Sequence, residues 1–171
     1  MAERLFLRPA VAADLAAIMA IERGPGFERF VGRSGEDEHR ALMASGNHRY
    51  FVGELGQGGV AGFAILRDLE DAHGNVYLKR IAVARPGKGV GAAFLSLVVA
   101  WVFAQPSPHR FWLDCFSDNL RAQRVYQKLG FSRDGVLRQA YRAPDGRRLD
   151  LTMMALTRPE WTGAVSAAPA G

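Results

Sequence analysis

Several features that would restrict function are missing from this sequence. It has one cysteine, Cys115, so no disulfide can form within the chain, and its apolar neighbours predict a buried thiol without a catalytic role. No apolar run approaches the roughly 18 residues of a membrane span, and the first residues lack the apolar core of a signal peptide. The four histidines are scattered without zinc-binding spacing. These absences predict a cytoplasmic protein with no metal site and no membrane contact.

Blocks of like charge are missing as well. The chain has 22 basic and 17 acidic residues, a net charge of +5 and a pI near 9.9, which suits an anionic partner. The basic residues are spread along the chain, however, so solubility explains them as well as nucleic acid does, and no nucleic-acid partner is expected. With 171 residues and 49% hydrophobic residues, we expect one domain over residues 1–161. The small residues of 162–171 predict a flexible tail.

The order of apolar patterns predicts a mixed α+β fold. Short turns between successive strand patterns favour antiparallel pairing, whereas a strand–helix–strand crossover over 76–116 favours one parallel pair. Ser117 or Asp118 is expected to cap the last helix and Gly130 to end it. The predicted strands cover 4–10, 48–55, 60–70, 76–84, 110–116, 135–143 and 147–156, and the predicted helices cover 12–23, 36–45, 89–104 and 117–130.

A glycine-rich turn joins a strand to a helix in "AVARPGKGVGAAF" (82–94). The first N–H groups of a helix have no intrahelical partner and attract anions, and glycines let the backbone approach a phosphate closely. Gly87, Gly89 and Gly91 alternate with other residues there, so the turn predicts a pyrophosphate-binding loop. A tight turn that binds nothing is the alternative.

The same turn also satisfies the dinucleotide-binding motif G-x-G-x-x-A through Gly87, Gly89 and Ala92. Asp114 follows at about the spacing of a ribose-binding acid. The hairpin-linked strands before the turn argue against this interpretation, because a dinucleotide domain needs repeated parallel units. A dinucleotide-dependent oxidoreductase and a non-catalytic acyl-CoA-binding module both remain alternatives.

Two segments taken together resemble the GNAT superfamily of N-acetyltransferases. They are "IAVARPGKGVGAAFL" and "HRFWLDCFSDNLRAQRVYQKLGFSRDGVL", and the resemblance extends over residues 4–158 and is closest to the ribosomal-protein-alanine acetyltransferases. It departs from the family at Pro86, where Arg or Gln is usual. The resemblance implies a three-layer fold: a mostly antiparallel, twisted sheet of about seven strands with one splayed parallel pair, flanked by about four helices.

The resemblance also implies an activity and a set of site residues. The chain would transfer an acetyl group from acetyl-CoA to a primary amine of a protein N-terminus, peptide or small molecule, directly within a ternary complex. Tyr126 would protonate the leaving thiolate of coenzyme A. The residues implied to contact acetyl-CoA are Ile81, Ala82 and Val83 for the pantetheine, Gly87, Lys88, Gly89, Val90, Gly91 and Ala92 for the diphosphate, and Asn119 and Ala122 on the following helix.

The general base and the acceptor remain open in the sequence. Strand 76–84 carries no acid, so Glu70, Asp71, His73, Asp114 or water are all candidates for the base. We expect the loop 24–35 and the helix 36–45 to form one wall of the acceptor cleft, and the last hairpin with Tyr141 to form the other. The edge of that hairpin could pair with a second copy, which makes a homodimer possible. Four arginines near these walls hint at an acidic acceptor: Arg33, Arg40, Arg138 and Arg142.

Overall fold

The seven strands of the described residues form one mixed sheet. The structure, a computed structural model, describes residues 4–56 and 58–163. Every strand pair is antiparallel except β4 with β5, which run parallel on either side of a helical crossover. The predicted fold is therefore confirmed. In sheet order the strands are β1 (Leu5–Pro9), β2 (His48–Leu55), β3 (Val60–Arg67), β4 (Asn75–Val83), β5 (Arg110–Phe116), β7 (Arg148–Thr157) and β6 (Ser132–Arg142).

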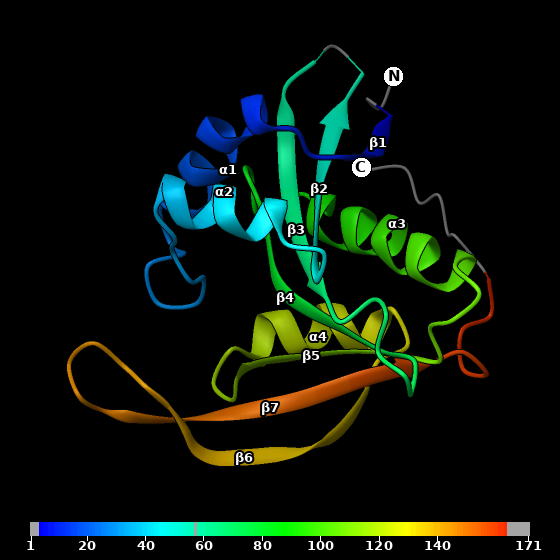
Figure 1. The fold of residues 1–171 in the computed structure, drawn as a ribbon. Helices are drawn as coiled ribbons and strands as arrows, with labels where there is room; N and C mark the ends of the chain where they lie inside the picture. The colour runs from blue at the N-terminus through cyan, green and yellow to red at the C-terminus, as the bar shows by residue number, and fades with distance from the viewer. Residues whose placement is uncertain (1–3, 57, 164–171) are drawn as a thin grey trace.

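Helices cover both faces of the sheet and complete three layers (Figure 1). Leu15, Ile18 and Ile21 bury the inner side of the first helix against β2 and β3, in a small cluster on one face. The larger cluster lies on the other face, where Phe94 and Val98 pack beside Phe111. The helices are α1 (Leu15–Glu22, after a 3-10 turn at Ala12–Asp14) and α2 (Glu36–Ala44) on the first face, and α3 (Val90–Ala104) and α4 (Leu120–Lys128) on the second.

Strands β4 and β5 separate along most of their length. They pair only from Asn75 to Tyr77, opposite Arg110 to Trp112. Beyond this point the sides of the two strands that face each other make no ladder, so their backbone groups are open to another partner. A bulge in β4 adds to the distortion, since Leu66 pairs with Leu78 while the neighbouring Ile65 pairs with Arg80. The predicted splayed pair is confirmed, and it opens a cleft in the middle of the sheet.

The start of α4 differs from the prediction. The Asn119 side chain, and neither Ser117 nor Asp118, caps this helix by accepting a hydrogen bond from the backbone N–H of Ala122 at 3.2 Å. The two predicted caps have other partners: the Ser117 hydroxyl lies 2.9 Å from that of Thr152, and Asp118 forms an ion pair with Arg29. Gly130 ends the helix as predicted, with φ of 95°.

Two further expectations concern membrane-spanning helices and the C-terminal tail. In the ranges that the structure describes, no helix is both long and apolar enough to cross a bilayer. The predicted flexible tail lies outside the described residues from 164 onward.

Candidate active site

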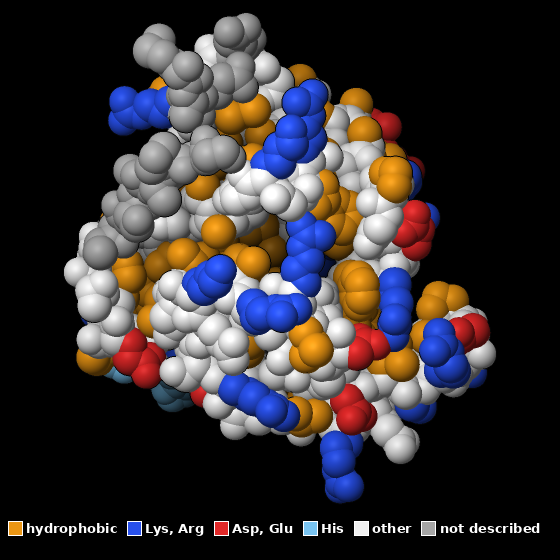
Figure 2. All heavy atoms as spheres, turned by 180° about the vertical axis from the view of Figure 1, so that it is seen from behind, with side chains coloured by type: hydrophobic (Ala, Val, Ile, Leu, Met, Phe, Trp, Pro, Cys, Tyr) orange, Lys and Arg blue, Asp and Glu red, His pale blue; other side chains and the backbone are white. Residues whose placement is uncertain are grey.

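A cavity of about 810 Å³ opens where β4 and β5 separate. Its size suits a small-molecule or cofactor site. On the face opposite to the view of Figure 1, the surface is hollowed, with hydrophobic side chains in its depth and Lys and Arg side chains beside it (Figure 2). Such a hollow suits a ligand with an apolar arm and an anionic end. The cavity is lined by the α1–α2 loop, the open parts of β4 and β5, the start of α3, the inner side of α4, and the last hairpin.

One end of the cavity is built to receive an anion. Gly89 is the N-cap of α3 with φ of 76°, and no side chain caps this helix, so the first N–H groups of α3 are left for another acceptor. Gly87 has φ of 98°, and a Cβ placed on it would lie 3.6 Å from Nη2 of Arg121 on α4. The guanidinium therefore stands beside the glycine turn, and both offer donors to the same space.

The structure brings most of the predicted ligand-binding residues to this cavity. Lys88 and Val90 are the exceptions: Lys88 is exposed, and Val90 packs against the larger core cluster. Arg121 is a lining residue that the sequence reasoning missed, although it stands two positions after Asn119 and on the same turn of α4. The predicted residues that line the cavity are Ile81, Ala82, Val83, Gly87, Gly89, Gly91, Ala92, Asn119, Ala122 and Tyr126.

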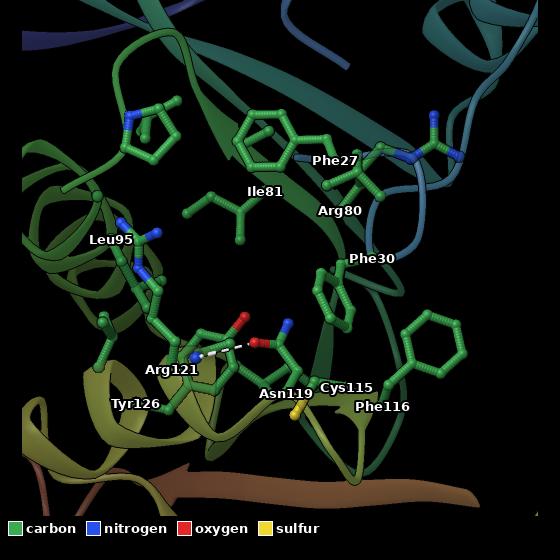
Figure 3. A pocket seen from close by; sticks show the side chains of 18 of the residues that line it. Phe27, Phe30, Arg80, Ile81, Leu95, Cys115, Phe116, Asn119, Arg121 and Tyr126 are labelled. Carbon is green, nitrogen blue, oxygen red and sulfur yellow. Dashed lines mark hydrogen bonds between the residues drawn. The ribbon is translucent and has the colours of Figure 1, made fainter. Parts of the chain in front are cut away.

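Tyr126 lies beside Asn119 at the floor of the cavity (Figure 3). Burial raises the pKa of its hydroxyl, and nearby Cys115 and Asp114 raise it further. The hydroxyl therefore keeps its proton at neutral pH. Cys115 is half-buried and lines the cavity, which corrects the prediction of a buried thiol. Its own pKa is raised to about 11 by burial and by Asp114, so it is a thiol and a poor nucleophile at neutral pH.

Among the four side chains considered as general base, Asp114 alone lines the cavity. It lies on β5 just beyond the last pair with β4, and its Oδ1 accepts a hydrogen bond from the Tyr77 hydroxyl at 2.5 Å. Asp71 instead organises the β3–β4 turn, where it accepts from the backbone of His73 and Asn75. Glu70 is exposed in the same turn. The structure thus separates Glu70, Asp71 and His73 from the site.

The opposite end of the cavity is aromatic. Phe27 and Phe30 come from the α1–α2 loop, Phe116 from the end of β5 and Tyr141 from β6. The loop and Tyr141 both line the cavity, as the sequence predicted, but they meet through Phe116 at one end of it and do not form two opposite walls. The prediction that helix 36–45 lines the cleft is wrong, because no residue of α2 reaches it. The four arginines thought to face the acceptor also lie outside the lining: Arg33, Arg40, Arg138 and Arg142.

Comparison with known proteins places this arrangement in a family. The family model described as "Acetyltransferase (GNAT) domain" matches residues 4–132, which is most of the chain. The chain belongs to the GNAT acetyltransferase domains. The predicted family and fold are both confirmed.

Proteins similar to this GNAT domain include polyamine acetyltransferases. Spermine/spermidine N(1)-acetyltransferase of Bacillus subtilis is 30% identical over 93 residues, and the match spans 50% of this chain but only 61% of that protein. A spermidine N-acetyltransferase from Vibrio cholerae, solved with CoA and spermine, superposes with a TM-score of 0.80 at 22% identity, over 91% of this chain and 96% of that one. A putative acetyltransferase of known structure has 26% identity and a TM-score of 0.76, over 94% of this chain and 87% of that one. The finer resemblance to ribosomal-protein-alanine acetyltransferases is not confirmed.

A buried polar network holds the α1–α2 loop of this GNAT domain against the sheet. The fully buried Glu22 accepts hydrogen bonds from the Ser34 backbone N–H at 3.1 Å and from Arg80 Nη1 at 2.9 Å. Its Oε1 also lies 3.2 Å from Nε2 of buried His39, whose Nδ1 lies 2.9 Å from the Tyr50 hydroxyl. Arg80 belongs to the open part of β4, so one carboxylate joins the loop to the strand that lines the cavity.

Proposed function

We propose that this GNAT domain is an acetyl-CoA-dependent N-acetyltransferase that acts on a primary amine. One observation carries the proposal: the gap between β4 and β5 connects the uncapped start of α3 to a protonated Tyr126 and to the carboxylate of Asp114. A ligand with an anionic end and a reactive thioester at the other end matches that order of groups. The polyamine substrates named for the similar proteins fit the same reaction class.

The glycine turn and Arg121 would hold the diphosphate, because both present N–H donors to the same space. The unpaired edges of β4 and β5 would accept the pantetheine arm as an additional strand between them. Ile81, Ala82 and Val83 lie on that part of β4. Their backbone would therefore align the thioester, and a free N–H there would polarise its carbonyl.

Direct transfer requires three proton movements, because an amine that arrives as an ammonium ion loses two protons before it is an amide nitrogen. Asp114 takes the first proton, directly or through water, and passes it to solvent. The neutral nitrogen then bonds to the acetyl carbon while the carbon–sulfur bond breaks, Tyr126 gives its proton to the departing thiolate, and the second amine proton replaces it on Tyr126, so that free CoA, an amide and one released proton are formed. No covalent enzyme intermediate is needed, which agrees with the raised pKa of the Cys115 thiol.

Two other functions receive no support from the fold. A dinucleotide-binding domain needs several parallel strands in succession, and the described sheet has one parallel pair. The dinucleotide interpretation also requires Asp114 to bind a ribose, but its carboxylate accepts a hydrogen bond from the Tyr77 hydroxyl within the sheet. A non-catalytic acyl-CoA-binding module would not require a proton donor and a base beside the thioester, which are the roles proposed for Tyr126 and Asp114.

The cytoplasmic location, the lack of a nucleic-acid or membrane partner and the homodimer stay predictions.

A thiol-release assay tests the proposal. The protein is mixed with acetyl-CoA and, in separate reactions, with a dipeptide, a polyamine, an amino acid, an aminoglycoside and an arylalkylamine. We expect amine-dependent release of free CoA with at least one acceptor, and an acetylated product of matching mass. Acetyl-CoA binding without turnover of any amine would favour the non-catalytic module instead.

The Asp114→Asn variant is expected to lower kcat/KM for the amine at pH 7 by at least about tenfold. Asn keeps an oxygen that can accept from Tyr77 but loses the base. The defect should shrink as the pH rises toward the pKa of the amine, because more acceptor is then already neutral. Glu70→Gln, on the exposed β3–β4 turn, is the control and should behave like the parent. An equal defect at every pH would contradict the role of Asp114 as base.

The Arg121→Gln variant is expected to raise the KM for acetyl-CoA by roughly tenfold, since a hydrogen bond to a charged group contributes about 1.5–3 kcal/mol. The kcat should change little, because the diphosphate lies away from the reacting carbon. Arg124→Gln provides the matched control on the same helix: it is exposed and does not line the cavity. If both variants raise KM equally, general surface charge and not Arg121 attracts the cosubstrate.

A further inference from the structure

Four aromatic side chains from three separate segments gather at the acceptor end of the cavity. The Phe116 ring lies 6.2 Å from that of Phe30 and 4.9 Å from that of Tyr141, in tilted and edge-to-face arrangements. Phe27 lines the same end from the α1–α2 loop. Phe30 and Tyr141 remain 36% and 40% exposed, so this aromatic wall still presents apolar surface to the opening.

The aromatic wall lies across the cavity from the phosphate end. In Figure 3, Phe30 and Phe116 are on one side, Arg121 and Leu95 on the other, and Tyr126 lies below the space between them. The wall therefore borders the position from which an amine would approach the thioester. An acceptor that enters at this end contacts the wall before it reaches Asp114 and Tyr126.

Among the described residues that line this cavity, one carboxylate is available to pair with an ammonium group. Asp118 is paired with Arg29, whose guanidinium also lies 5.3 Å from the centre of the Phe30 ring. Arg80 is paired with the buried Glu22, which also forms an ion pair with Arg23. Of the two acidic groups that line the cavity, Asp114 is therefore the one without a basic partner among the described residues, while Lys79 and Arg121 add positive charge.

We infer that the acceptor is a monoamine carried on an aromatic body, which packs against Phe30 and Phe116 while its amino group faces Asp114. This inference rests on the proposed function and narrows its substrate class. An aromatic body gains edge-to-face and stacking contacts with the wall and covers its exposed surface. The single ammonium group meets the single carboxylate, gives its first proton to it and so becomes the neutral nucleophile, and leaves no further charge to be solvated.

A polyamine fits this end poorly for the same reasons. After one nitrogen is deprotonated for attack, its other ammonium groups still need carboxylates or water. The cavity offers them the like charges of Lys79 and Arg121 and no second unpaired carboxylate among the described residues. The ring faces attract an ammonium group, but this attraction is small beside the hydration that the group loses on burial. A substrate with several cationic groups requires several carboxylates, and the described lining of this cavity offers one that is unpaired.

Acetylation rates of four amines test the inference on the full chain. They are 2-phenylethylamine, 2-cyclohexylethylamine, n-hexylamine and spermidine, each followed by CoA release and by product mass. We expect kcat/KM to be highest for 2-phenylethylamine, by at least about tenfold over spermidine and by a smaller factor over the cyclohexyl amine of similar size. A higher kcat/KM for spermidine or n-hexylamine than for 2-phenylethylamine overturns the inference and leaves the proposed function intact.

Variants of the wall separate its contribution from simple folding effects. Phe30→Leu and Phe116→Leu keep an apolar side chain but remove the ring. Each should raise the KM for 2-phenylethylamine several-fold, reduce its advantage over n-hexylamine, and leave the KM for acetyl-CoA unchanged. Phe6→Leu is the matched control, because Phe6 is 47% exposed on β1 and does not line the cavity. Equal effects of all three variants, or no effect of the first two, contradict the inference.

Failure of the inference and failure of the proposed function give different results. Acetyl-CoA that binds while none of the aryl amines is acetylated overturns the inference alone, if another amine is a substrate. Acetyl-CoA that neither raises the unfolding temperature nor releases CoA with any amine contradicts the proposed function itself.

Discussion

The Tyr126→Phe variant is expected to lose at least about tenfold in kcat while it still binds acetyl-CoA. Removal of the hydroxyl takes away the proton for the leaving thiolate but keeps the ring, which packs against Phe131 with centroids 6.1 Å apart. The fold and the pantetheine cleft should therefore persist. Steady-state CoA release gives kcat, and thermal unfolding with and without acetyl-CoA shows whether binding survives.

The raised pKa of Tyr126 predicts how kcat depends on pH if this residue is the acid. An acid acts only below its pKa, so a pKa raised above the ordinary value of about 10 keeps the hydroxyl protonated through the whole working range. We expect kcat of the parent protein to show no alkaline decline below about pH 9. Unchanged kcat in Tyr126→Phe would eliminate this residue as the acid, whatever the pH profile.

The Glu22→Ala variant is expected to lower the free energy of unfolding by about 3–5 kcal/mol, because it leaves a largely buried Arg80 without its counter-charge. It also removes the acceptor for the Ser34 N–H, and with it a support of the loop that carries Phe27 and Phe30. The KM for the amine should rise as the loop loses its anchor. Urea unfolding measures the change in stability, and initial rates with the amine that is acetylated most efficiently measure the change in KM.

An exposed ion pair provides the control for Glu22. Glu36 pairs with Arg40 on α2, with both side chains more than half exposed, and Glu36→Ala should change stability by no more than about 0.5 kcal/mol. Glu22→Gln keeps an acceptor oxygen without the charge and is expected to lose less stability than Glu22→Ala. If Glu22→Ala is no less stable than Glu36→Ala, the buried network does not hold the loop.

The parts of the fold that follow from local pattern were predicted well. Strands at 48–55 and 110–116 have the predicted limits, because apolar alternation and turn residues act over a few positions. The glycine turn was likewise recognisable, since positive φ at Gly87 and Gly89 requires residues of that type. The choice of helix cap was wrong at Ser117 and Asp118 because distant residues, Thr152 and Arg29, compete for those side chains.

The residues within the two family motifs were predicted, whereas most side-chain contacts between distant segments were not. Glu22 lies at helical spacing in α1, but its partner Arg80 is far along the chain and meets it only through the fold. The aromatic wall has the same origin, since Phe30, Phe116 and Tyr141 are brought together by a loop, a strand end and a hairpin. Asp114 could be separated from the other candidate bases only when the opening between β4 and β5 was located.

Thermal unfolding with acetyl-CoA and with NAD tests most directly whether the cleft between β4 and β5 is an acetyl-CoA site. At about 100 times its Kd, acetyl-CoA should stabilise the fold by about 2.7 kcal/mol, whereas NAD should give no shift. Arg121→Gln should need a higher acetyl-CoA concentration for the same shift, and Arg124→Gln should not. Stabilisation by NAD without any effect of acetyl-CoA would contradict the account.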